Sequence, residues 1–130
     1  MDEVVRVGRV SSILPEDGHI RVTYPEMDAS VTKEIPVFFM HGEYRMPPVG
    51  SQVLVLHLSD GQDAGVALGG YWSDEDIPEE TGADLYRKDM VSGYLADRGG
   101  AVELHGDSIT LSDATGSITV SELIKAVKGG

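Results

Sequence analysis

The segment GAVELHGDSITLSDATGSITVSELI, residues 100–124, decides how the second half of this 130-residue chain folds. Apolar and polar side chains alternate along it, as they do in a strand with one buried face. Turn residues interrupt the alternation twice, so the segment predicts three short strands that each bring two aliphatic side chains. These six candidate core residues are Val102, Leu104, Ile109, Leu111, Ile118 and Val120.

A sheet of three such strands buries too little apolar surface to be stable alone. Either it folds back on the rest of the chain, or identical copies supply the missing face. Three copies around a threefold axis would close the sheets into a prism, with all six aliphatic residues inside and no exposed strand edges. We therefore expect the sheet of residues 100–121 either to dock on the rest of the chain or to assemble as a homotrimer.

The final segment, TVSELIKAVKGG (119–130), has a helical pattern. Thr119 or Ser121 is suited to the N-cap, Glu122 favours the first turn, and the last two glycines stop the helix. We expect this helix and its tail at 122–130, with an apolar stripe formed by Leu123, Ile124 and Val127. A short helix is marginal in isolation, so the stripe is expected to dock on symmetry mates or on a separate tip protein.

Residues 1–73 predict a second architecture. A loop is expected at 41–51, which holds two prolines and two glycines, and Gly8 is a place where a long first strand can bend or bulge. Ile20, Val22, Val53 and Val55 alternate on central strands and are expected in the core. Five alternating runs predict strands at 4–14, 19–25, 31–39, 52–61 and 64–72. This pattern is typical of a small OB-like five-stranded barrel, and a small sandwich is the alternative.

Between these regions, residues 74–99 are expected to form an acidic linker and one or more connecting strands. The stretch SDEDIPEETGAD (73–84) carries six acids and no base, so it cannot supply a core. The fold class is thus mainly β, in four parts: 1–73, 74–99, 100–121 and 122–130.

Composition limits the function classes. The formal net charge is −12, which opposes binding to nucleic acid and to anionic lipid surfaces. No apolar run is long enough for a membrane helix, and the start MDEVVRVGRV lacks the order of a secretory signal. Cysteine is absent, which excludes disulfides and thiolate metal sites. We expect synthesis in the cytoplasm, no stable membrane insertion and no nucleic-acid partner.

Residue types typical of catalysis or metal binding are present but not grouped. His19, His41, His57 and His105 lack the spacing of a ligand pair, and the acids of 73–84 lack the order of a calcium loop. The sequence therefore predicts no metal, no cofactor and no catalytic residue. The five aromatic residues of the barrel are expected to serve as core or as a protein-facing patch, rather than as a stacking platform for nucleic acid: Tyr24, Phe38, Phe39, Tyr71 and Trp72.

Three segments in order carry a resemblance to a known family: PVGSQVLVLHLSDG with AGVALGGYW, the acidic linker, and SGYLADRGGAVELHGDSITLSD. This order resembles the baseplate assembly protein V and spike family of contractile phage tails and related injection machines. The resemblance implies an amino-terminal barrel on the tail hub or tube protein and an intertwined trimeric β-helix. It also implies a virion baseplate location and a spike that caps the tail tube and transmits the contraction stroke. The His-x-His pair that binds iron at some needle tips is missing here.

Three functions remain open at this point. The first is a structural spike or hub component of an injection apparatus, and the resemblance favours it. The second is a trimeric OB-fold module that binds carbohydrate or protein without a tail role. The third is a small hydrolase, which would require a concave cluster of acids or histidines.

Overall fold

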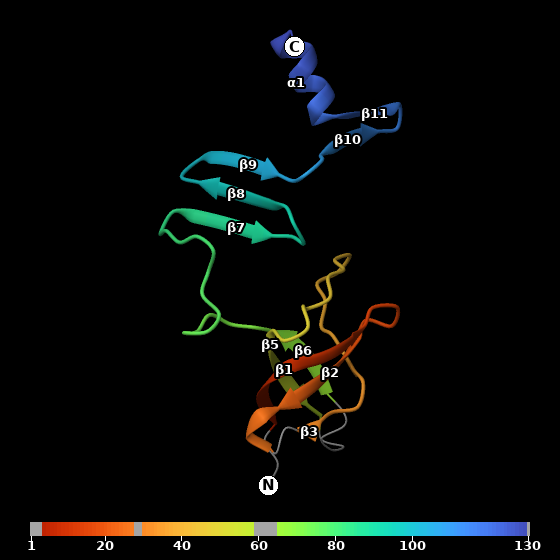
Figure 1. Cartoon of the computed structure of the whole chain (residues 1–130), viewed down its shortest axis with the longest axis vertical. Coiled ribbons are helices and arrows are strands. Elements are labelled where there is room, and N and C mark those ends of the chain that lie inside the picture. Colours follow the sequence, from red (N-terminus) through yellow and green to blue (C-terminus); the bar gives the residue numbers. More distant parts are fainter. Residues whose placement is uncertain (1–3, 28–29, 59–64, 130) are drawn as a thin grey trace. The chain divides into compact units, whose positions relative to one another are not determined.

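The structure is a computed structural model that describes residues 4–27, 30–58 and 65–129, without the side chain of Met27. The described chain is mainly β, built from antiparallel sheets, with one short α-helix near its carboxyl end (Figure 1). The chain divides into two compact units, Met1–Pro78 and Glu79–Gly130. The expected mainly-β class and the carboxy-terminal helix are confirmed.

The first unit contains one six-stranded sheet. Its path runs β3-β2-β1-β5-β6, and β4 pairs with β2 off this path. Val37, which follows β4, bridges to Ala67 of β6, and the Phe38 amide donates to the Ala67 carbonyl oxygen at 2.7 Å. Because β4 joins β2 on one side and its continuation joins β6 on the other, the sheet closes on itself. Its strands are β1 (Val5–Leu14), β2 (His19–Tyr24), β3 (Ser30–Val31), β4 (Ile35–Pro36), β5 (Gln52–His57) and β6 (Gly65–Gly69).

The strand predictions hold with several differences, one of which is that β6 ends at Gly69, three residues before the expected 72. The expected strand at 31–39 is two shorter strands, β3 and β4. β4 ends at Pro36, after which the Val37 amide donates to the Gly18 carbonyl oxygen at 2.9 Å and Val37 bridges to Ala67 of β6. The irregularity of β1 lies between Val10 and Ser12 instead of at Gly8. Gly8 is required for close packing, because an added Cβ would lie 2.5 Å from Val22 Cγ1. The expected turn between β5 and β6, with the adjoining strand ends at 59–64, lies outside the described residues.

The core of the first unit lies inside this closed sheet. Ile20, Val22, Val53 and Val55 are at most 1% exposed, as expected from their alternation. Val10, Tyr24, Ile35 and Ala67 complete the buried cluster. Residues 41–51 contain no strand, and the loop prediction is confirmed.

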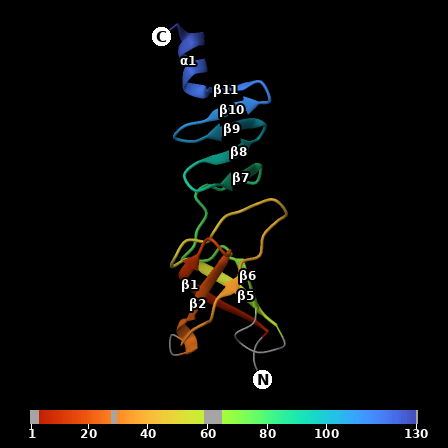
Figure 2. The ribbon, with the colours of Figure 1, turned by 90° about the vertical axis from the view of Figure 1, so that its right-hand side faces the viewer.

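The second unit contains a three-stranded antiparallel sheet, a hairpin and the helix in succession (Figures 1 and 2). The sheet order is β7-β8-β9, and β10 pairs with β11 alone. The elements are β7 (Leu85–Asp89), β8 (Tyr94–Arg98), β9 (Ala101–His105), β10 (Thr110–Asp113), β11 (Gly116–Thr119) and α1 (Val120–Lys128).

Three strands appear along residues 100–124 as the alternation predicts, but the second begins after Ile109, at Thr110, and the third ends one residue early. Val120 was expected in a strand and is the first residue of α1. The reason is the capping box: Thr119 Oγ1 accepts from the Glu122 amide, and the Glu122 carboxylate accepts from the Thr119 amide. The helix therefore begins two residues before the expected 122. Gly129 ends it in the left-handed conformation, whereas Gly130 lies outside the described residues.

Candidate functional site

The sheet β7-β8-β9 exposes an apolar area on one of its faces. Leu95 lies directly opposite Leu104, and Val102 lies on the same face two residues along β9. Val102 is 69% exposed and Leu104 is 51% exposed, although both are strand residues with aliphatic side chains. Asp97 of β8 lies opposite Val102 on this face, and Tyr86 and Lys88 of β7 continue it, so its character is mixed beside the three aliphatic residues.

The hairpin β10–β11 repeats this arrangement. Leu111 lies opposite Ile118, and the Val120 amide donates to the Ile109 carbonyl oxygen at 2.8 Å. Ile109 precedes β10 and Val120 follows β11, and their backbone hydrogen bond extends the register by one pair, which indicates that both lie on the side of Leu111 and Ile118. Leu111 is 48% exposed, and Ile109 and Val120 are half-buried. The hairpin thus carries four aliphatic residues on one side.

The opposite side of the hairpin carries threonine and serine side chains. Thr110 pairs with Thr119, and Ser112 pairs with Ser117. This alternation is the sequence pattern of a strand pair with one buried face. Within the second unit, however, no other element covers the aliphatic side, so the hairpin has the pattern of a buried sheet without its cover.

We call these two aliphatic areas together the apolar strand face; the structure places all six sequence-predicted residues within it. Val102 and Leu104 belong to the sheet, whereas the other four belong to the hairpin and the start of α1. Sequence reasoning missed one member, Leu95 on β8. The alternation in YLADR (94–98) was the available signal, but this run was assigned to a connecting region.

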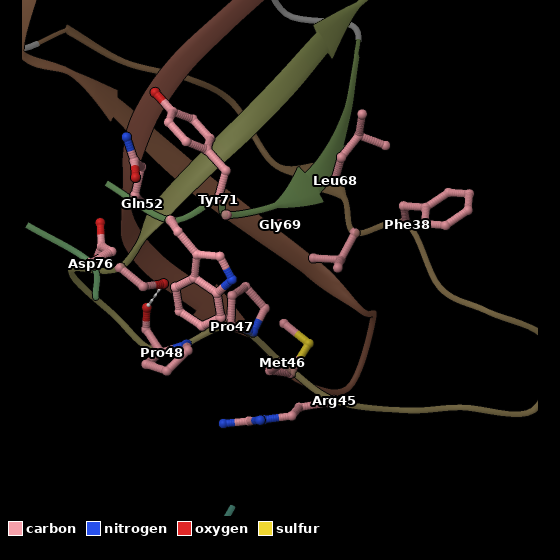
Figure 3. A pocket seen from close by; sticks show the side chains of 14 residues that line it. Phe38, Arg45, Met46, Pro47, Pro48, Gln52, Leu68, Gly69, Tyr71 and Asp76 are labelled. Carbon is pink, nitrogen blue, oxygen red and sulfur yellow. Dashed lines mark hydrogen bonds between the residues drawn. The ribbon is translucent and has the colours of Figure 1, made fainter. Parts of the chain in front are cut away.

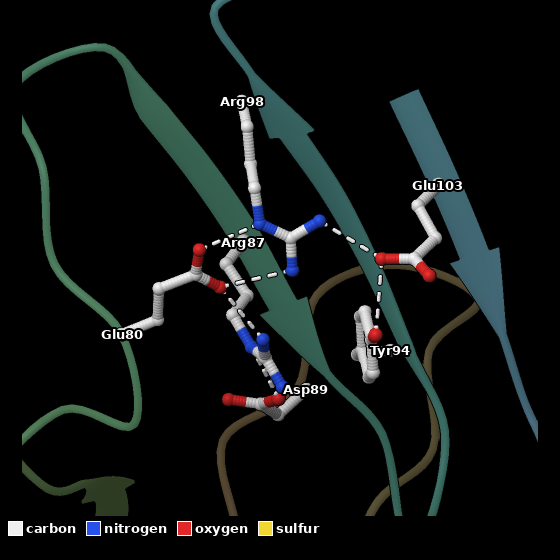
Figure 4. Close-up of polar contacts among 6 residues, drawn as sticks. All are labelled: Glu80, Arg87, Asp89, Tyr94, Arg98 and Glu103. Carbon is white, nitrogen blue, oxygen red and sulfur yellow. Dashed lines mark hydrogen bonds and ion pairs between the residues drawn. The ribbon is translucent and has the colours of Figure 1, made fainter. Parts of the chain in front are cut away.

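The other face of β7-β8-β9 is covered by a polar network (Figure 4). Glu80 accepts from Arg98 Nε at 2.6 Å and from Arg87 Nη1 at 2.8 Å. Arg98 also donates to Glu103 at 2.8 Å, and the Tyr94 hydroxyl donates to the same carboxylate oxygen at 3.0 Å. Segment 79–84 is therefore attached to this face of the sheet.

This network seals its face of the sheet. The Arg87 guanidinium lies 4.0 Å from the Tyr94 ring centroid, and Tyr94 stacks on His105. Beneath these side chains Ala96 is completely buried. Side chains of the second unit thus cover one face of the sheet, whereas the opposite face has no cover within that unit.

The network also shifts acid–base equilibria. Hydrogen bonds from Arg98 and then Arg87 lower the pKa of Glu80 to about 2. Arg98 and Tyr94 lower the pKa of Glu103 in the same way. Both carboxylates are therefore ionised at neutral pH. In this form they accept hydrogen bonds from their partners and do not take part in proton transfer.

Helix α1 presents the expected stripe. Leu123, Ile124 and Val127 lie on one side, and no residue of the helix is buried. Val127 is 82% exposed. Glu122 at the amino end and Lys125 and Lys128 at the carboxyl end agree with the helix dipole. The helix therefore has both its caps, but no other described element of the second unit buries its apolar side.

The first unit carries a separate surface groove of about 610 Å³ (Figure 3). Phe38, Leu68, Tyr71 and Trp72 line it, together with Met46, Pro47, Pro48 and the polar side chains of Arg45, Gln52 and Asp76. Trp72 is 70% exposed. Of the five aromatic residues named from the sequence, only Tyr24 is in the core, and the other four are on the surface. Such a concentration of apolar side chains at a surface is typical of a contact site.

The first unit contains a buried polar pair, Tyr24 and His57, whose geometry indicates a structural role. Tyr24 and His57 share a hydrogen bond of 2.7 Å between the hydroxyl and Nε2. Burial raises the pKa of the Tyr24 hydroxyl to about 12, so it stays protonated. His19 and His41 belong to the first unit and His105 belongs to the second. Among the described residues, no group of three or more histidine or acidic side chains is placed to hold a metal ion.

Within residues 4–27, 30–58 and 65–129, no helix has the length and apolar character needed to cross a membrane. Comparisons with protein-family models and with curated proteins gave no match to this chain.

Proposed function

We propose that this protein is a structural component of a contractile phage tail or related injection apparatus, a trimeric baseplate spike or hub protein. In this proposal three copies cap the tail tube and help to pierce the target envelope. The partners are two further copies, a tail hub or tube protein and, at the carboxyl end, either the symmetry mates or a separate tip protein. The protein resides in the baseplate of the particle after synthesis in the bacterial cytoplasm.

One observation carries the proposal: no other element of the second unit covers the apolar strand face. Its side chains have the alternation of a buried sheet, while the opposite face of β7-β8-β9 is already closed by the Glu80 network. A soluble monomer rarely leaves a contiguous set of aliphatic side chains exposed. Two further copies around a threefold axis would cover it and close the strands into a short intertwined β-helix or prism.

The first unit supports the same proposal through its topology. We interpret the closed antiparallel sheet, with its long first strand, as an OB-like barrel. A barrel followed by strands that need symmetry mates is the order on which the family resemblance rests. The exposed aromatic groove of the barrel is a suitable contact for a hub or tube protein. The proposal involves no catalytic step.

The tail role is tested in intact particles. Uncontracted tails are purified on a density gradient from cells that carry this gene, and their proteins are quantified by mass spectrometry. We expect this chain in the tail fraction at about three copies per baseplate, as a single threefold spike requires. Recovery of the chain only among soluble proteins, with tails complete without it, would contradict the proposal.

The groove favours a second candidate, a trimeric OB-fold module that binds carbohydrate or protein without a tail role. Exposed aromatic rings beside polar side chains are suited to stacking on sugar rings. Trp72 is the only tryptophan in the chain, so its fluorescence reports on this groove alone. A saturable change on titration with cello- or chito-oligosaccharides would favour this candidate, and a flat titration would count against its carbohydrate form.

A further inference from the structure

The strongest additional feature is the apolar side of α1, which is wider than the three residues identified from the sequence. Val120, Leu123 and Val127 follow a spacing of three and then four, which places them at positions a, d and a of a heptad. Ile124 and Ala126 then occupy the e and g positions. The exposed Lys125 and Lys128 fall at f and b, on the other side.

The width of this stripe indicates how many helices it accommodates. A two-stranded coiled coil needs only a narrow a/d seam, and its e and g positions are usually charged. Here e and g are isoleucine and alanine, so the apolar surface faces more than one neighbour. A helix that contacts two other helices at once is the arrangement of a three-helix bundle.

The stripe is continuous with the apolar strand face. Ile118 and Val120 lie on the aliphatic side of the hairpin, and Val120 is also the first residue of the helix. The capping box of Thr119 and Glu122 fixes this junction, because each residue satisfies the other's amide. A cover that packs on the hairpin therefore meets the helix next.

From these features we infer that α1 packs against the α1 helices of two further copies of this chain, as a short parallel bundle that closes the carboxyl end of the trimer. This inference rests on the proposed trimer and names the partner of the helix. Nine residues span about 13 Å along the helix axis. Helices side by side cover a stripe of that length, whereas a tip protein seated at the carboxyl end covers only the last turn.

The chain contains no cysteine, so a single introduced cysteine reports directly on the neighbours of one position. We compare Val127→Cys, on the stripe, with Lys125→Cys, on the opposite side and half a turn away. Each purified variant is treated with a mild oxidant and, in parallel, with a short bis-maleimide. Light scattering and circular dichroism verify that both variants keep the mass and helix content of the unaltered protein.

We expect most Val127→Cys protein to run as a covalent dimer on a denaturing gel, with one chain of each trimer left over, and Lys125→Cys to remain largely monomeric. Trimeric Val127→Cys protein that fails to cross-link, or equal cross-linking at the two positions, would overturn the bundle and leave the proposed trimer intact. A monomeric mass for the unaltered protein would instead remove the trimer itself.

Discussion

Replacing Leu111 with aspartate is the perturbation that bears most directly on the apolar strand face. Leu111 lies opposite Ile118 and is 48% exposed in the single chain. Complete burial of a leucine contributes about 2 kcal/mol, so covering its exposed half in a trimer contributes about 1 kcal/mol per chain and roughly 3 kcal/mol for three chains. Since 1.4 kcal/mol corresponds to a tenfold change, this loss alone weakens assembly by about a hundredfold.

The new carboxylates add to this loss. Three of them would meet near the axis, where removal from water and mutual repulsion cost several kcal/mol more. Leu111→Asp is therefore expected to be monomeric at micromolar concentration by light scattering. The first unit has its own core, so its cooperative unfolding should be retained. Burial and repulsion also raise the pKa of these carboxyls, so part of the trimer should return as the pH falls toward about 4.

Thr110→Asp is the matched control for Leu111→Asp. Thr110 is adjacent in sequence but lies on the opposite side of the hairpin, opposite Thr119, where an added carboxylate faces water. We expect this variant to keep the mass of the unaltered protein. A trimer that survives Leu111→Asp, or is lost equally with Thr110→Asp, would refute the proposed orientation of the strands.

Three further predictions concern stability. Val55→Asp places a charge at a completely buried position of the first unit and should lower the free energy of unfolding by several kcal/mol; an unchanged melting temperature would contradict its core assignment. Glu80 has a pKa lowered from 4.5 to about 2 by Arg98 and Arg87, so its stabilising contribution is complete above pH 4.5 and is lost as the pH falls toward 2. Thermal melts of Glu80→Gln should therefore show a weaker acid dependence than the unaltered protein, and parallel curves would argue against the network. Thr119→Ala removes the N-cap and should destabilise α1 by about 1 kcal/mol. We expect a loss of helical circular dichroism, and an unchanged helical signal would contradict this role of Thr119.

The strands of both units could be predicted where alternation is clear. Val53 and Val55 alternate with less buried neighbours on β5, and the structure buries both. The end of β11 was less accessible to this reasoning, because Val120 continues the alternation of Ile118 and equally begins a helical stripe. The capping box resolves the ambiguity, since it gives the helix two satisfied amides at Thr119 and Glu122.

The polar face of β7-β8-β9 could not be predicted from the sequence. Glu80 is one acid among six in residues 73–84, and nothing in that run distinguishes it from a solvated side chain. Its role arises only after strand pairing brings Arg87 and Arg98 to the same face. Leu95 was missed for a related reason: its partner Leu104 is nine residues away, and only the register of β8 with β9 brings them together.

The central claim is that two other copies of the chain cover the apolar strand face. Sedimentation equilibrium of the unaltered protein at several concentrations tests it most directly. We expect a single species at three times the 13.9 kDa mass of one chain, maintained on dilution to about micromolar concentration. A single species at 13.9 kDa across the same range would contradict it.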